Sequence, residues 1–265
     1  MRGAGVSLME KLSELEDPRQ PSNGTRHDFR EILVIAVCAM LSDADSFEDI
    51  ALCGRLKADW LRRFLVLKNG IPSQDTFLRV FRVLDPKQFE TVFRRWVGGI
   101  VGALDGVLAV DGKTLRRSAD GDAPPVHMVS AFSTELGLVL GQEKVAGKSN
   151  EITAIPELLE ALHIKGLLVS IDAMGCQREI AARIVRAHWA IENRLHWMLD
   201  VCFGEDDCMI RKDHAPQNLS LLKKIVLNLI RADKTDTAKT SLRLKRKRAA
   251  WDDDIRMKML GIHPL

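Results

Sequence analysis

The hydrophobic and polar positions divide the chain into a first part with helical spacing and a second part with short apolar runs. Up to about residue 105, apolar residues recur every three or four positions, which is the pattern of helices with one buried face. Residues 28–41 are apolar almost throughout, so we expect this helix to lie at the centre of its domain. The pattern predicts an all-helical domain over residues 1–104.

After residue 105 the apolar runs become shorter and are bounded by turn residues, which is typical of strands. Four runs are predicted to be strands: residues 106–115, 127–134, 137–145 and 166–172. The short connection at residues 134–137 predicts an antiparallel hairpin, and a helix over residues 152–162 precedes the last strand. This order of strands and helices indicates an α/β domain, which we assign to residues 105–235.

In two of the predicted strands the apolar run ends on an aspartate, Asp111 and Asp172. If these strands lie side by side, both carboxylates reach one cation, and Mg²⁺ prefers such oxygen ligands. A pair of metal ions can hold the attacking and leaving oxygens when a nucleic-acid backbone is cut or joined. Two structural explanations compete with this one: Asp111 and Gly112 can form a hairpin turn, and Asp172 can cap a helix.

A predicted helix over residues 177–199 places several polar side chains on one face. Glu192 and His196 share one face of it with Trp189 and Asn193. Zinc sites are an alternative, built either from His188, Glu192 and His196 or from Cys202, Cys208 and His214. Their spacings match no standard zinc pattern, so the carboxylate interpretation is favoured.

Composition and charge narrow the range of functions only slightly. The net charge of the 265 residues is +3, so any contact with nucleic acid must come from local basic clusters. The five cysteines are scattered and odd in number, which favours reduced thiols in a cytoplasmic protein. The longest apolar runs are far too short to span a bilayer, so we expect no membrane partner.

Basic residues cluster in two places that suit contacts with phosphate groups. The helical domain, which could place a short helix in a DNA groove, carries Arg62, Arg63, Arg79, Arg82, Arg94 and Arg95. A C-terminal tail over residues 236–265 includes residues 243–248, five cations in six positions. In both places the alternative is a set of solvated surface positions.

Six segments taken together are specific to a known family. They are residues 109–113 (AVDGK), 148–152 (KSNEI), 170–174 (SIDAM), 188–197 (HWAIENRLHW), 200–206 (DVCFGED) and 249–252 (AAWD). In these segments, which extend over nearly the whole chain, the sequence resembles the H-repeat-associated bacterial insertion-sequence transposases.

The resemblance implies a ribonuclease-H-like domain with a mixed sheet and an associated N-terminal helical domain. It implies a triad of Asp111, Asp172 and Glu192 that holds two Mg²⁺ ions, with Mn²⁺ as a substitute. It also implies double-stranded DNA as the partner, in particular the terminal repeats of an insertion sequence, and a homo-oligomer on that DNA. The residues expected to contact DNA are Lys113, Arg116, Arg117, Arg186, Lys245, Arg246, Lys247 and Arg248.

One departure from the family pattern lies between the second and third acids. Glu192 follows Asp172 by only 20 residues, too few for the strand and insertion that the family places there. We therefore expect an in-frame deletion near residues 180–186 and a truncated sheet without its fifth strand.

The deletion predicts a defect in the triad. If residues 177–199 form one helix, Glu192 lies about 22 Å from its start, at a rise of 1.5 Å per residue. A helix after a strand runs back along the sheet, away from the aspartates. Glu192 then does not join Asp111 and Asp172, and the chain is a poor or inactive catalyst, unless the helix breaks near residues 182–185. The alternative function is a catalytically dead DNA-binding remnant that interferes with intact relatives.

Overall fold

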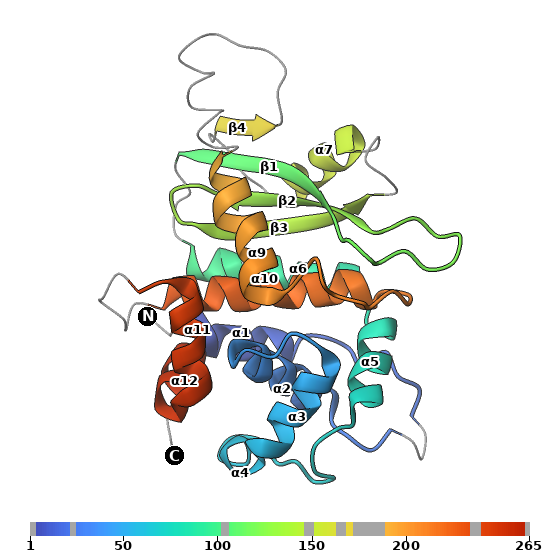
Figure 1. The fold of residues 1–265 in the computed structure, drawn as a ribbon, viewed down its shortest axis with the longest axis vertical. Helices are drawn as coiled ribbons and strands as arrows, with labels where there is room; N and C mark the ends of the chain where they lie inside the picture. The colour runs from blue at the N-terminus through green and yellow to red at the C-terminus, as the bar shows by residue number, and fades with distance from the viewer. Residues whose placement is uncertain are drawn as a thin grey trace. The chain divides into compact units, whose positions relative to one another are not determined.

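The computed structural model describes residues 4–21, 25–101, 106–145, 151–162, 168–171, 189–233 and 240–262 (Figure 1). The chain forms two compact units. Unit 1 contains Met1–Val92 and Asp213–Leu265, and unit 2 contains Phe93–Lys212. The two ends of the chain therefore fold together, whereas we expected residues 213–235 to belong to the α/β domain and residues 236–265 to form a separate tail.

Unit 1 is helical, as the spacing of its apolar residues predicts. Its helices are α1 (Ala4–Leu12), α2 (Phe29–Leu41), α3 (Phe47–Leu56), α4 (Ala58–Leu61), α5 (Gln74–Val83), α10 (Ala215–Ala232), α11 (Leu242–Trp251) and α12 (Asp253–Leu260). Helix α6 (Pro86–Ile100) begins in unit 1 and continues into the segment of unit 2. The prediction for α2 is confirmed: every side chain from Ile32 to Leu41 is buried, and α2 packs against α1, α3, α10, α11 and α12.

Helix α10 fixes the C-terminal segment to the N-terminal helices. Asn218 is fully buried, and its Nδ2 donates hydrogen bonds to the carbonyl oxygens of Phe81 and Leu84, both at 2.9 Å. These carbonyls lie at the C-terminal end of α5, where no helical N–H remains to satisfy them. Gln217 Nε2 also donates to Glu90 Oε1 at 2.9 Å. A distant segment of the sequence thus completes the end of an N-terminal helix.

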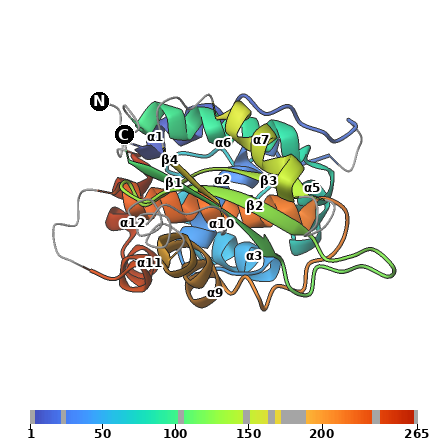
Figure 2. The same ribbon diagram turned by 90° about the horizontal axis from the view of Figure 1, so that it is seen from above.

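Unit 2 contains a four-stranded mixed sheet in the order β3-β2-β1-β4. The strands are β1 (Val107–Thr114), β2 (His127–Ser133), β3 (Leu138–Val145) and β4 (Leu168–Ile171). β2 is antiparallel to both β1 and β3, whereas β4 runs parallel to β1. Helix α7 (Glu151–Ala161) covers one face of the sheet and α9 (Trp197–Phe203) lies on the other (Figure 2). The α/β fold and the hairpin at residues 134–137 are confirmed, and within the described residues this sheet has no fifth strand.

Strand β1 places Asp111 within the sheet rather than in a turn. Asp111 pairs with a residue in the middle of β2, so the hairpin-turn interpretation of Asp111 and Gly112 is wrong. Because successive strand residues point to opposite faces, Asp111 and Lys113 share one face and Gly112 points to the other. A Cβ atom on Gly112 would lie 2.4 Å from Glu151 Oε1 and 2.6 Å from His127 Nε2. A side chain at residue 112 would therefore force His127 and Glu151 to move.

The predicted basic tail is helical, and one of its cations is buried. Arg246, on α11, is 1% exposed. Its Nε donates to the carbonyl oxygen of Met40 at 2.9 Å, and its Nη2 donates to the carbonyl oxygen of Ala44 and to Asp45 Oδ1, both at 2.8 Å. Its Nη1 lies 3.2 Å from Asp43 Oδ1. Arg246 thus holds the end of α2. Its guanidinium is buried there, so Arg246 does not belong with the residues expected to contact DNA.

We predict that Arg246→Ala lowers the free energy of unfolding of unit 1 by about 3 kcal/mol, because it leaves buried carbonyl oxygens without donors. Urea denaturation of the full chain, followed by far-UV circular dichroism, measures the change. Arg243→Ala is the matched control, since Arg243 is exposed on the same helix and its removal changes the charge equally. Its expected effect is below about 0.5 kcal/mol. Equal effects of the two substitutions would contradict a structural role for Arg246.

Candidate metal centre

Asp111 supplies the first carboxylate of a cluster that fits a metal ion. The four residues before it, Val107–Val110, are buried and hold β1 in the middle of the sheet. The Asp111 side chain is only 11% exposed. The N–H of Gly112 donates to Asp111 Oδ1 at 2.9 Å, and the other carboxylate oxygen, Oδ2, lies near His196. The strand thus presents a rigidly held carboxylate.

Glu192 and His196 begin and end a π-helical turn directly ahead of α9. His196 Nδ1 lies 3.5 Å from Glu192 Oε2 and 3.6 Å from Asp111 Oδ2. One ligand atom from each of the three residues lies within 4.8 Å of the other two. The His196 side chain is 7% exposed and that of Glu192 is 49% exposed, so the cluster is closed at the histidine and open to solvent at the glutamate.

The donor set of this cluster fits a divalent cation. Carboxylate oxygens suit Mg²⁺ and Mn²⁺, and an imidazole nitrogen suits Mn²⁺ and other transition metals. Because ligands lie about 2.0–2.2 Å from such ions, atoms with this spacing reach one common ion after small side-chain movements. The metal-competent group found within the described residues contains no cysteine, which gives the alternative with Cys202 and Cys208 no support.

The structure corrects the expected separation of the acids. Asp111 and Glu192 are neighbours, so the prediction that Glu192 lies far from the aspartate on β1 is wrong. That prediction assumed one continuous helix from residue 177. Asp172, Arg186 and His188 lie outside the described residues, and their roles stay predictions.

The ion pairs of Lys113 explain why Glu192 lies close to Asp111. Its Nζ forms a hydrogen-bonded ion pair with Asp200 Oδ1, and it lies 3.3 Å from Glu205 Oε2 and 3.6 Å from Asp206 Oδ1. Lys113 is two residues beyond Asp111 on the same face of β1, and Asp200 is on α9, eight residues beyond Glu192. Attraction between these charges holds α9 on the sheet, so the position of Glu192 depends on contacts that follow it in the sequence.

The charges around Lys113 also shift the pKa values of Lys113 and Asp200. Burial by itself lowers the pKa of Lys113, but the charge of Glu205 and the hydrogen bond to Asp200 outweigh burial, so the pKa of Lys113 is raised. Burial and the neighbouring carboxylates of Asp206 and Glu205 raise the pKa of Asp200, although its bond to Lys113 acts in the opposite direction. Lys113 therefore stays charged at neutral pH.

Arg194, inside the π-helical turn, provides a second anchor. Its Nη1 donates to the carbonyl oxygen of Thr134 at 2.6 Å, and its guanidinium lies 5.6 Å from the centroid of the Phe132 ring. Gly137 has a φ of 69°, and a Cβ atom there would lie 2.5 Å from Arg194 Nη2. Arg194 thus packs against the β2–β3 hairpin, and this contact fixes the π-helical turn that carries Glu192.

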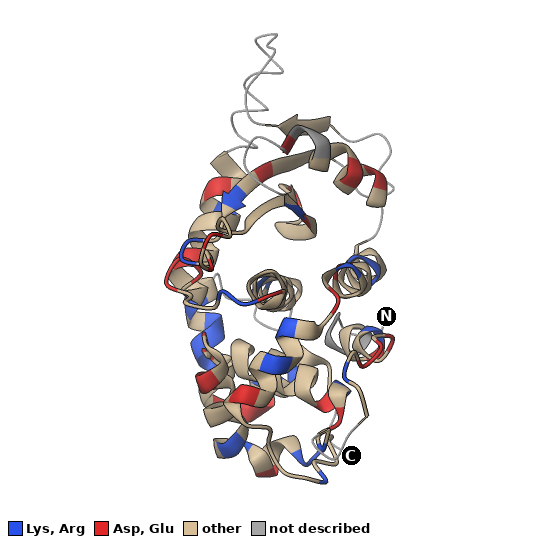
Figure 3. Ribbon diagram, turned by 90° about the vertical axis from the view of Figure 1, so that its right-hand side faces the viewer, with Lys and Arg blue, Asp and Glu red and all other residues tan. Residues whose placement is uncertain are grey.

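The residues expected to contact DNA have different environments. Lys113 is 14% exposed and enclosed by carboxylates, which corrects its expected role as a phosphate ligand. Arg116 and Arg117 are 75% and 53% exposed and lie 3.2 Å from Asp206 and 3.5 Å from Asp207, respectively. Lys245, Lys247 and Arg248 are partly exposed on α11. Basic and acidic segments are interspersed along the described helices rather than segregated (Figure 3).

Sequence reasoning missed two features of the site. His196 was grouped with Glu192 by its spacing of four, but only as part of the zinc alternative. The partners of Lys113 were missed because Glu205 and Asp206 follow α9, where no periodic pattern links them to β1. The signal that could have found them is the run of three acids at residues 205–207, set against the basic run at residues 113–117.

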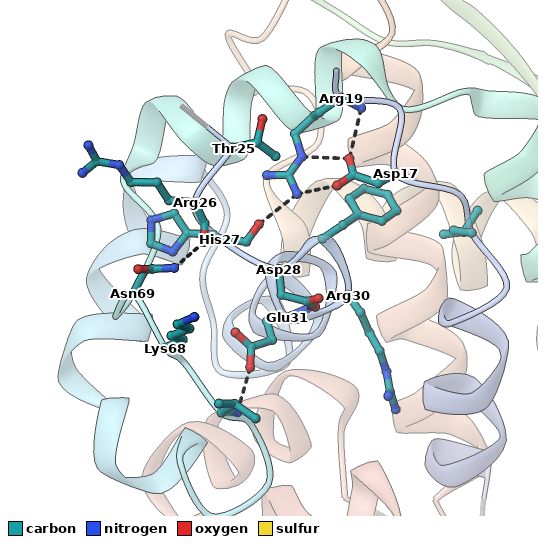
Figure 4. Close-up of a pocket in the computed structure, with 13 residues that line it drawn as sticks. Asp17, Arg19, Thr25, Arg26, His27, Asp28, Arg30, Glu31, Lys68 and Asn69 are labelled. Carbon is teal, nitrogen blue, oxygen red and sulfur yellow. Dashed lines mark hydrogen bonds and ion pairs between the residues drawn. The ribbon is translucent and has the colours of Figure 1, made fainter. Parts of the chain in front are cut away.

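A separate cavity of about 620 Å³ lies in unit 1 (Figure 4). The loop before α2 lines one side of it, and Val66, Lys68 and Asn69 line another. Arg19 faces this space, but its guanidinium is held by Asp17 at 2.7 Å and by the carbonyl oxygen of His27 at 2.9 Å. None of the residues predicted to bind metal or DNA lines the cavity.

Within the described residues, the structure contains no helix whose length and apolar character would allow it to cross a membrane.

Two family models match consecutive parts of the chain. A model described as a transposase DDE domain matches residues 102–185, and a model described as DDE_Tnp_1-associated matches residues 9–97. The first match identifies the mixed sheet of unit 2 as ribonuclease-H-like. No solved structure matches the chain.

Curated relatives match at 30–47% identity. An "Uncharacterized protein in dhlA 3'region" of Xanthobacter autotrophicus is 47% identical over 176 residues, which are 65% of this chain and 60% of that protein. The "H repeat-associated putative transposase YhhI" of Escherichia coli K12 is 30% identical over 362 residues, covering 92% of this chain and 95% of the relative. The "Putative transposase YncI" of E. coli O157:H7 is 31% identical over 360 residues, covering 92% of each.

The lengths of these matches support an internal deletion. The match to YhhI spans 362 positions, whereas this chain has 265 residues, so at least 97 positions (362 minus 265) have no counterpart here. Since the match covers 92% of this chain, the additional residues of the relative lie between matched parts. The match to the DDE model ends at residue 185, within the segment where the sequence predicts the deletion.

We predict that Lys113→Met lowers the free energy of unfolding of unit 2 by about 3 kcal/mol, because Glu205 then stays buried without its compensating charge. Hydrogen exchange in β1 and α9, combined with urea denaturation, measures the loss. Arg117→Met is the matched control, since its ion pair is exposed and is worth less than about 1 kcal/mol. Similar exchange rates in the two variants would contradict the role of Lys113 as an anchor.

The stability difference between the native chain and Lys113→Met should also depend on pH. Since the pKa of Lys113 is raised in the folded state, its contribution is complete below the unfolded pKa of about 10.4 and is lost as the pH rises through the folded value. The stability difference between the native chain and Lys113→Met should therefore be constant from pH 7 to 9 and shrink above about pH 10.4. A difference that shrinks below pH 9 would contradict the assignment.

Proposed function

Because the chain belongs to the family of H repeat-associated DDE transposases, we propose that it cuts and joins strands of double-stranded DNA by metal-dependent phosphoryl transfer. One observation carries this proposal. Asp111 and Glu192, which come from a strand and a helical turn far apart in the sequence, place ligand atoms within 4.8 Å of each other. Two carboxylates at this spacing are suited to hold a divalent cation against phosphate oxygens.

The proposed metal ligands are Asp111, Asp172 and Glu192, for Mg²⁺ with Mn²⁺ as a substitute. The register of β4 supports the inclusion of Asp172, because Ile171 pairs with Val110 and the two aspartates are the next residues in the sequence. When bound, such ions polarise the phosphate and activate an attacking water or hydroxyl group. The chain's own part is to hold the carboxylates at fixed spacing, and the exposed side of Glu192 leaves a path for the DNA backbone.

Exposed and partly exposed cations of both units are the proposed contacts to DNA. The ion pairs of Arg116 and Arg117 with nearby aspartates involve exposed guanidinium groups, so they are weak and phosphate groups can compete for them. Arg186, Lys245, Lys247 and Arg248 complete the proposed set. The DNA is proposed to be the terminal repeats of an insertion sequence, bound by a homo-oligomer in the cytoplasm.

A second candidate function is a DNA-binding remnant without catalysis. The observation that favours it is the absence of at least 97 positions that the relative YhhI has within the matched span. Such a chain would occupy the ends of an insertion sequence or form mixed oligomers with intact relatives. Strand cleavage distinguishes the two candidates, because both predict DNA binding.

We predict that the full chain, supplied with Mg²⁺ or Mn²⁺, nicks a supercoiled plasmid that carries the DNA flanking its own coding sequence. Asp111→Asn and Glu192→Gln should each reduce nicking by about 100-fold or more, because each removes a metal ligand worth several kcal/mol in the transition state. Gel electrophoresis of the plasmid measures the reaction. Asp122→Asn, an exposed loop residue of the same unit, is the control for the loss of one carboxylate and should retain full activity.

Binding of the flanking DNA, measured by a mobility shift, completes this experiment. Binding without nicking by the native chain would contradict the enzymatic proposal and favour the remnant. Nicking that survives both Asp111→Asn and Glu192→Gln would show that the reaction arises elsewhere. Absence of both binding and nicking would contradict both candidates.

A further inference from the structure

His196 is a buried imidazole that faces the two acids and belongs to no part of the proposed triad. Its side chain is 7% exposed, and Nδ1 lies 3.5 Å from Glu192 Oε2 and 3.6 Å from Asp111 Oδ2. One ring nitrogen is therefore equidistant, within 0.1 Å, from one oxygen of each carboxylate.

These distances distinguish two roles for the ring. A direct N–H···O hydrogen bond is about 2.7–3.2 Å long, so neither carboxylate is at the distance of a good donor–acceptor pair. Two ligands of one ion, each about 2.1–2.2 Å from it and separated by angles of about 90–110°, lie roughly 3.0–3.6 Å apart. The spacing of Nδ1 from both oxygens agrees with the second arrangement.

The backbone supports the same role. Glu192 and His196 are the first and last residues of a π-helical turn, a conformation that is rare and is concentrated at functional sites. Arg194, inside this turn, is held by the carbonyl oxygen of Thr134 and by the Phe132 ring. The turn is thus fixed from outside the cluster, with its glutamate and histidine both directed to Asp111.

We propose that His196 Nδ1 is a direct ligand of the cation held by Asp111 and Glu192, and that this mixed nitrogen and oxygen centre prefers Mn²⁺ over Mg²⁺. The preference follows because Mg²⁺ favours oxygen ligands, whereas imidazole stabilises first-row transition metals. This inference rests on the proposed function, since it concerns the same metal centre. It adds a ligand and a metal preference that the three acids alone do not give.

The test measures metal binding without any reaction. The full chain is titrated with Mn²⁺, and pulsed electron paramagnetic resonance of bound Mn²⁺ detects coupling to a nearby ¹⁴N nucleus. The native chain should show this coupling and bind Mn²⁺ more tightly than Mg²⁺. His196→Gln should abolish the coupling and weaken Mn²⁺ binding by at least about 10-fold, with a smaller effect on Mg²⁺.

Two further variants keep the test specific. His127→Gln removes another buried histidine that contacts a carboxylate, Glu151, at the opposite face of the sheet, so it should leave the coupling unchanged. His196→Asp restores a ligand with oxygen in place of nitrogen, so it should bind metal without the coupling and favour Mg²⁺ relative to the native chain. Circular dichroism confirms folding of each variant.

The possible outcomes distinguish a failure of the role of His196 from a failure of the proposed function. Native chain that binds Mn²⁺ without nitrogen coupling, or coupling that persists in His196→Gln, would overturn the role of His196 and leave a carboxylate centre in place. If Asp111→Asn binds Mn²⁺ as tightly as the native chain, the metal centre itself is refuted, and the proposed function fails with it. Because the native chain alone reports the coupling, the test does not depend on the folding of any variant.

Discussion

The ion pairs of Lys113 join the strand that carries Asp111 to the helix that follows Glu192, and the candidate metal centre depends on this link. A partly buried ammonium group is stabilised by opposite charges close to it, and Asp200, Glu205 and Asp206 provide them. Any shift of α9 along the sheet would separate these charges. The spacing of the metal ligands is therefore set by electrostatic contacts outside the centre, together with the grip of the β2–β3 hairpin on Arg194.

Features that depend on local pattern were predictable from the sequence. The continuous apolar run over residues 28–41 predicted the buried α2, and the four apolar residues before Asp111 predicted a buried strand that carries a carboxylate. In both cases burial is encoded by neighbouring residues with a fixed period. The short connection at residues 134–137 predicted the β2–β3 hairpin, because so few residues can join only neighbouring antiparallel strands.

Features that depend on long-range contacts were not predictable in this way. The position of Glu192 was inferred from the segment before it, but Lys113 and Arg194 fix it through contacts with distant residues. Arg246 belonged to a basic run that suited contacts with phosphate. In the structure its guanidinium instead donates hydrogen bonds to carbonyl oxygens at the end of α2. The hairpin-turn alternative for Asp111 and Gly112 failed because β1 continues through both residues and pairs with β2. Each error arises where tertiary contacts override a local pattern.

The assembly of unit 1 from both ends of the chain has a consequence for the history of the gene. Unit 2 is inserted between the two parts of unit 1, so an in-frame loss within the insert leaves every residue of the helical unit present. A frameshift or stop codon in the insert would instead remove α10 to α12, leaving the carbonyls at the end of α5 without Asn218 and the end of α2 without Arg246. A folded helical unit thus reports that the reading frame has survived, and shortened descendants that persist as stable proteins are expected to be those whose lesions preserve it.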